Sequence, residues 1–161
     1  MNKKNRFFTA DKLLSGSVNG INNDITSLND LIAVKGLYLT QNDVREVVRT
    51  RTRALNENCR FEIGTESVRK IAESIFSSQF VDRSNFCDTL CTFIRIFYYI
   101  KTASFDTIPD DDVVRLLKDM YENVCYGSLS DMKGREVDMI LHYIETEKAK
   151  QASSGGKGEV R

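Results

Sequence analysis

Apolar residues recur at helical spacing in most of the chain, and this periodicity constrains the fold more than any other feature. In residues 41–58, for example, Val44, Val47, Val48 and Leu55 fall on one helical face. Only Arg60–Ile63 alternates polar and apolar side chains, which indicates a connector or a very short strand. Five clear helical patterns with short links predict an all-α fold, a single compact bundle of five to six helices with a disordered C-terminal tail.

Local signals predict where the helices begin and end. Thr40 is a good N-cap, and Asp43 occupies the capping-box position three residues later. Pro109 suits a helix start, followed by acidic residues that favour the helix dipole. We predict helices over about 24–34 (after a loop and ending at Gly36), 41–58, 65–77, from Asp82 or Ser84 to about 102, and from Pro109 to Val124. A last helix follows Gly127-Ser128, with an apolar face of Met132, Val137, Ile140, Leu141 and Ile144.

The length of 161 residues fits one domain. We expect a helical domain over 1–148, partly flexible in 1–22, and a flexible tail over 149–161, which contains Ser153-Ser154-Gly155-Gly156. The basic start lacks the apolar run of a secretory signal, and no apolar run is long enough to span a bilayer. Four cysteines without such a signal are typical of reduced thiols, so the prediction is a cytoplasmic protein with no membrane association.

Charge is balanced in total but uneven along the chain. The 23 basic and 23 acidic residues exclude a generally basic nucleic-acid coat protein. Residues 1–60 nevertheless have a net charge of +4 and residues 101–148 of −5. In the basic part, Arg45, Arg49 and Arg53 form a stripe along one helix, with Arg60 beyond it. This candidate basic face could follow phosphates, or it could be a solvated face or one paired with the acidic half.

Arg51 is the anomaly of the 41–58 pattern, because it lies 20° from Val44 on the helical wheel, inside the apolar arc. A buried guanidinium must be paired, since burying it alone costs several kcal/mol. Glu62 is the expected partner, and the hydroxyl of Tyr98 or Tyr99 could complete a buried polar cluster. Three interpretations remain open: a structural ion pair, a polar pocket for a small anionic ligand, and a side chain that reaches the surface.

No pattern predicts a catalytic residue or a cofactor. His142 is the one histidine, no nucleophile is tied to it, and phosphate-binding and zinc-protease motifs are absent. Cys87 and Cys91 share a helical face and could be half of a thiolate site that Cys59 and Cys125 complete. The spacing lacks a CxxC knuckle, however, so core thiols are the stronger interpretation and no metal is predicted. The acids at 110–112 are explained by a helix start rather than by a cation site.

Several strings resemble an uncharacterised family of small Firmicutes proteins, described as a domain of unknown function. The matching strings, which cover roughly residues 36–129, are Val48-x-x-Arg51-x-x-Ala54-Leu55, Glu57-Asn58-x-Arg60-x-Glu62-x-Gly64, Ile96-Phe97-Tyr98-Tyr99-x-Lys101, Asp110-Asp111 and Cys125-x-Gly127-Ser128-Leu129. The chain departs from the pattern at Cys59, at Pro109 and after Gly64. The resemblance implies a bacterial cytosolic protein and transfers no activity.

These observations predict a non-catalytic helical module that acts through protein–protein contacts, as an accessory or regulatory component with an unknown protein partner. Two alternatives stand beside this prediction. One is a nucleic-acid-binding domain that uses the stripe of Arg45, Arg49 and Arg53. The other is a small-ligand pocket around Arg51, Glu62 and Tyr99.

Overall fold

A computed structural model describes the backbone of residues 5–155 and the side chains of residues 19–155. In these residues the chain forms seven α-helices and no strand, which confirms the all-α prediction. The helices are α1 (Asn5–Ile32), α2 (Gln41–Glu57), α3 (Glu66–Ile75), α4 (Phe86–Ala103), α5 (Asp110–Asp119), α6 (Leu129–Met132) and α7 (Glu136–Ser154). A 3₁₀ turn (Ala33–Lys35) follows α1, and a π-helical turn (Met120–Val124) follows α5.

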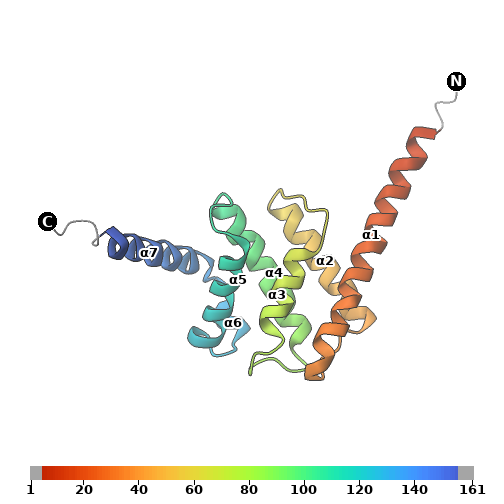
Figure 1. The fold of residues 1–161 in the computed structure, drawn as a ribbon. Coiled ribbons are helices and arrows are strands. Elements are labelled where there is room, and N and C mark those ends of the chain that lie inside the picture. Colours follow the sequence, from red (N-terminus) through yellow and green to blue (C-terminus); the bar gives the residue numbers. More distant parts are fainter. Residues whose placement is uncertain (1–4, 156–161) are drawn as a thin grey trace.

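Helix α4 is the centre of the bundle. It packs against α2, α3, α5 and α7, and its buried side chains include Leu90, Phe93, Ile94 and Phe97. Helices α1 and α7 lie on the outer sides and extend away from the bundle in opposite directions (Figure 1). None of the helices in the described part of the chain combines the length and the hydropathy that crossing a bilayer requires.

The predicted capping signals operate as expected. The Thr40 hydroxyl accepts a hydrogen bond from the Asp43 amide at 3.1 Å, and the Asp43 carboxylate accepts one from the Thr40 amide at 2.9 Å. Gly36 ends the α1 segment in the left-handed region, with φ of 70°. Asp110, Asp111 and Asp112 fill the first turn of α5 directly after Pro109. Local capping interactions therefore set the boundaries of these helices.

The loop predicted before residue 24 is wrong, because α1 is helical from Asn5 onwards. Asn and Gly disfavour helix locally, but Ile25, Leu28 and Ile32 are buried and Ile21 is partly buried at helical spacing. Tertiary packing of this face overrides the local preference. The flexibility predicted for residues 1–22 stays a prediction, and its first four residues lie outside the described part.

The single helix predicted after Ser128 is divided in two. Ser128 caps the short α6, and Gly134, with φ of 88°, separates it from α7. The break changes which face of the helix is apolar. Met132 is buried as predicted, and Met139, which was not predicted, is buried too. The other predicted positions are exposed or only partly buried: Val137, Leu141, Ile144 and Ile140. In the same way, the π-helical turn shifts the register after α5, so that Val124 is exposed and Cys125 is buried.

Helix α7 continues to Ser154, so Ala149–Ser154 is helical where a flexible tail was predicted. These six positions are exposed. Residues 156–161, the rest of the predicted tail, lie outside the described part.

Candidate functional site

Two loops meet at one end of the bundle, and we refer to them as the paired loops. The first is residues 58–65, between α2 and α3, and the second is residues 104–109, between α4 and α5; both lie at the upper edge of Figure 1. Two of the described charged residues are buried in the fold, Arg51 and Lys101. Each of them binds backbone carbonyls of one of these loops.

Arg51 holds the first loop. Its side chain is 3% exposed, and its Nη2 donates hydrogen bonds to the carbonyls of Glu62 at 3.1 Å and Gly64 at 2.7 Å. The prediction that Arg51 is buried beside Glu62 is confirmed. The expected ion pair is wrong, because Arg51 reaches the carbonyl of Glu62 and no carboxylate in the described part of the chain. A guanidinium in this position satisfies carbonyls that a loop cannot pair by itself.

The Glu62 carboxylate binds Tyr98 instead. The Tyr98 hydroxyl donates a hydrogen bond of 2.6 Å to Glu62 Oε2. Burial raises the pKa of Tyr98 well above its ordinary value, and the bond to Glu62 raises it further. Glu62 is thus held through both its backbone carbonyl and its side chain. These two bonds keep Glu62 on the inner side of the loop.

Lys101 holds the second loop. Its Nζ donates a hydrogen bond to the Ile108 carbonyl at 2.8 Å and forms an ion pair with Asp110 at 2.8 Å. It also lies 3.7 Å from the Asp106 carboxylate. The Ile108 side chain is buried, so this loop has an apolar anchor beside its polar one.

Arg60 and Asp106 join the two loops. The guanidinium of Arg60 donates two parallel hydrogen bonds to the Asp106 carboxylate, at 2.8 and 3.1 Å. This pairing raises the pKa of Arg60 and lowers the pKa of Asp106, in both cases chiefly through the hydrogen bonds. The Arg60 side chain is 19% exposed, so the bidentate pair is partly shielded from water. It fixes the position of one loop relative to the other.

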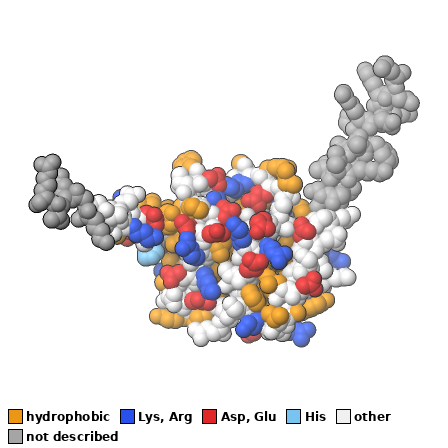
Figure 2. All heavy atoms as spheres, in the orientation of Figure 1, with side chains coloured by type: hydrophobic (Ala, Val, Ile, Leu, Met, Phe, Trp, Pro, Cys, Tyr) orange, Lys and Arg blue, Asp and Glu red, His pale blue; other side chains and the backbone are white. Residues whose placement is uncertain are grey.

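The outer side of the paired loops is apolar and exposed. Phe61 is 88% exposed, Ile63 83% and Phe105 88%, and we call these three the apolar loop residues. Hydrophobic side chains stand at the upper edge of Figure 2, the edge where the two loops lie in Figure 1. Phe105 and Asp106 both have left-handed backbone conformations, with φ of 52° and 58°. Residues other than glycine rarely adopt such angles. The exposed Phe105 is therefore held in a strained backbone conformation.

Tyr99 does not join the buried polar cluster. It is 43% exposed and lines a separate cavity that also contacts Arg95 and Lys133. Consecutive helical residues point about 100° apart, so only one of the two tyrosines can face Glu62. The predicted members Arg51, Glu62 and Tyr98 are therefore brought together, while Tyr99 is not.

Sequence reasoning missed Lys101, Asp106 and the apolar loop residues. A signal for the first was present, since Lys101 lies one turn after the buried Phe97 on α4. The alternation in Arg60–Ile63 also held a signal, because inward Arg60 and Glu62 leave Phe61 and Ile63 facing out. The sequence allowed the basic face to pair with the acidic half, but it did not single out Asp106, 46 positions after Arg60, as the partner.

The predicted basic face is divided in the structure. Arg45, Arg49 and Arg53 are exposed on α2, but Arg49 pairs with Glu46 at 3.1 Å and Arg45 binds the Asn42 side chain. Arg60 belongs to the paired loops rather than to this stripe. Basic and acidic side chains also alternate across the face shown in Figure 2.

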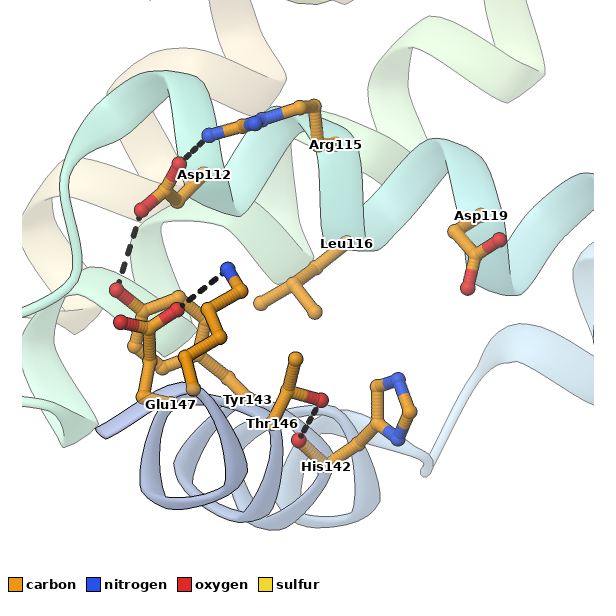
Figure 3. Close-up of a pocket in the computed structure, with 9 residues that line it drawn as sticks. Asp112, Arg115, Leu116, Asp119, His142, Tyr143, Thr146 and Glu147 are labelled. Carbon is orange, nitrogen blue, oxygen red and sulfur yellow. Dashed lines mark hydrogen bonds and ion pairs between the residues drawn. The ribbon is translucent and has the colours of Figure 1, made fainter. Parts of the chain in front are cut away.

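His142 lines a cavity of about 180 Å³ between α5 and α7 (Figure 3). One polar contact there joins the two helices, since the Tyr143 hydroxyl of α7 binds Asp112 of α5 at 3.1 Å. The other pairs, Asp112 with Arg115 and Lys150 with Glu147, each lie within a single helix. No cysteine or serine lines this cavity as a nucleophile. We locate the candidate functional site at the paired loops, where two buried cations and an ion pair hold exposed apolar side chains.

Comparison with known proteins identifies one relationship. The model of a family of unknown function, DUF6323, matches residues 24–150, which include both loops and every side chain that supports them. No curated protein and no solved structure matches the chain.

Proposed function

The chain belongs to DUF6323, a family of unknown function, and we propose that it is a non-catalytic module that docks on a protein partner through its paired loops. One observation carries the proposal: the two buried cations and a bidentate ion pair hold loops whose outer side chains are large, apolar and exposed. Exposed apolar groups on a rigid support are typical of interaction sites. In this proposal the module is an accessory or regulatory component.

The charge around the paired loops favours a partner of particular chemistry. Residues 57–66 and 101–112 contain seven acidic and two basic residues. The four aspartates among them are each paired with a cation, namely Arg60, Lys101, Lys70 and Arg115, so the negative charge is partly compensated. An anionic membrane or a nucleic acid gains no favourable charge contact at a surface of this kind. A protein that offers an apolar pocket with a basic rim complements both the apolar loop residues and the acidic surroundings. We therefore assign the docking surface to a protein partner of that kind.

Bacterial origin and a cytosolic location are also part of the proposal. The four cysteines are free thiols in the structure, and Cys59 is exposed. Free exposed thiols persist best in a reducing compartment, which supports the cytosol.

The proposal is tested by selecting peptides from a random displayed library. The wild-type chain is the target, and the variant F61S/I63S/F105S is used for counter-selection. We expect enriched peptides that combine large apolar residues with Lys or Arg, and whose affinity falls as salt is raised. Val137 and Leu141 provide a matched control, since they are exposed apolar residues on α7. The variant V137S/L141S should bind the selected peptides as the wild type does.

A selection in which counter-selection with the serine variant removes every peptide that binds the wild type would overturn the proposal, and so would a consensus that is acidic. Circular dichroism of each variant shows whether the helical fold is kept. Because the three side chains are exposed, we expect the fold to be unaffected.

The nucleic-acid alternative rests on Arg45, Arg49 and Arg53, and it has a separate test. A mobility-shift experiment at about 50 mM salt should show no shift of DNA or RNA if the docking proposal is right. A shift that is lost when Arg45 and Arg53 are replaced would favour the alternative.

A further inference from the structure

A groove runs along one face of α4, between α2 and the segment that joins α6 to α7. It consists of two surface cavities, of about 340 and 480 Å³, which are neighbours because Arg95 and Lys133 line both of them. None of the apolar loop residues lines either cavity, and of the paired loops only Asn58 reaches the groove. The side chains that α4 turns towards the groove and that are not fully buried lie three or four residues apart: Asp88, Cys91, Arg95 and Tyr99.

The middle of the groove is basic. Arg95 and Lys133 lie where the two cavities meet, and Arg53 of α2 joins them in the first cavity. None of these three cations forms an ion pair with another described residue. Their charges are therefore available to acidic groups of a ligand.

Both ends of the groove are acidic. Glu46 and Asp88 line the first cavity, and Glu57 and Glu136 line the second. Glu46 pairs within α2, whereas the other three carboxylates form no ion pair with another described residue. Helix α2 shows the order of the charges, because Glu46, Arg53 and Glu57 follow one another about 10 and 6 Å apart along its axis. The groove thus has an acidic, a basic and a second acidic layer.

The floor of the groove is uncharged and has the shape that a helix fills. Thr92 and Ile96 of α4 are buried beneath it, and Leu129 of α6 is partly buried at its wall. From Asp88 to Tyr99 the groove follows α4 for about 16 Å, or three helical turns. An amphipathic helix that lies along such a groove covers the floor with its apolar side chains and reaches the walls with its polar ones.

We propose that the groove binds an amphipathic helix of a second protein, which carries Asp or Glu in its middle turn and Lys or Arg in the turns at both ends. The acidic middle turn pairs with the basic layer, and the basic ends pair with the two acidic layers. A second copy of this chain, docked groove on groove about a two-fold axis, would bring the two basic layers together, so the groove does not complement itself. A nucleic acid is also disfavoured, because its phosphates would meet an acidic layer at each end.

The test is a selection from a displayed library of single helices, with the full chain as the target. The library varies one face of an alanine-based helix, and the variant R95E/K133E is used for counter-selection. We expect the selected peptides to have an acidic middle turn between two basic turns, and R95E or K133E alone should weaken their binding by at least about 10-fold. The matched control is R45E, which reverses an exposed cation of α2 outside both cavities and should bind these peptides as the wild type does.

A compensating exchange separates charge pairing from a loss of structure. A selected peptide whose middle acidic residues are replaced by Lys should no longer bind the wild type and should bind R95E/K133E. The original peptides should bind F61S/I63S/F105S as they bind the wild type, so failure at the groove and failure at the paired loops are distinguishable. The proposal is overturned by a counter-selection that removes every peptide, by a consensus with a basic middle turn, or by an exchanged peptide that binds neither chain.

Discussion

Arg51 shows at the scale of one residue why a charge is buried in an apolar helix face. Its side chain is buried, and its guanidinium binds two carbonyls of a loop that has no secondary structure to pair them. Removing it leaves both acceptors without a donor, and an unsatisfied buried group destabilises the fold.

Replacing Arg51 by Met therefore tests this role. Met keeps most of the volume but donates no hydrogen bond, so the free energy of unfolding should fall by about 2–4 kcal/mol. Urea denaturation measures the change. Arg45→Met is the matched control on the exposed face of the same helix, and it should change stability by less than about 0.5 kcal/mol. Equal stability of R51M and the wild type would show that the two carbonyls do not need Arg51.

Phe105 offers the opposite case, a residue that costs stability. Its backbone is left-handed, with φ of 52°, and its ring is 88% exposed, so strain is not offset by packing. Phe105→Gly should raise the free energy of unfolding by about 0.5–1 kcal/mol, because glycine adopts this backbone without a steric cost. Thermal denaturation measures the change, and Phe105→Ser, which keeps the strain, is the control. A loss of stability in F105G would mean that the ring packs against the fold.

At the scale of the elements, the paired loops depend on one ion pair between Arg60 and Asp106. The pKa of Asp106 is lowered in the folded chain by its bonds to Arg60. A carboxylate of this kind contributes stability above its ordinary pKa of about 4, and the contribution is lost as pH falls through the lower folded value.

Asp106→Asn should lower the free energy of unfolding at pH 7 by about 0.5–1 kcal/mol, a modest figure because the Asp106 carboxylate is half exposed. The difference between variant and wild type should shrink as pH falls below about 4, where the wild-type carboxyl takes up its proton. Urea denaturation over this pH range measures the effect, with Glu145→Gln on α7 as an exposed control. A difference in the free energy of unfolding that persists unchanged down to about pH 2–3 would contradict the assigned role of the ion pair.

The helices were predictable from the sequence to the extent that local signals decide them. Thr40, Gly36 and Pro109 place helix boundaries through short-range chemistry, and the structure agrees. The boundaries that failed depend on distant contacts or on register. Ile21 and Ile25 pack against the core and keep the chain helical around residue 24, and Gly134 separates α6 from α7. For the site, burial of Arg51 followed from its place on the helical wheel. The pairing of Arg60 with Asp106 could not be predicted, because it joins segments far apart in the sequence.

At the scale of the whole molecule, the balanced charge total conceals an acidic surface at one end. The negative stretch around residues 101–112 includes the loop that displays Phe105, so hydrophobic contact is offered beside acidic side chains. Arg60 and Lys101 pair with Asp106 and Asp110, so part of this acidic charge is neutralised where the loops are held. We propose that this end of the bundle, rather than the exposed apolar residues of α7, docks a protein partner.

Site-specific photocrosslinking in the cells that express the chain tests this claim most directly. A photoreactive phenylalanine analogue replaces Ile63 in the paired loops or, as the control, the similarly exposed Val34 in the 3₁₀ turn after α1. We predict one discrete protein adduct from position 63, whose contact surface contains Lys or Arg beside apolar residues. This adduct should disappear when Phe61 and Phe105 are replaced by Ser, and position 34 should not give it. The same adducts from both positions, or adducts from position 63 that survive the serine replacements, would contradict the account.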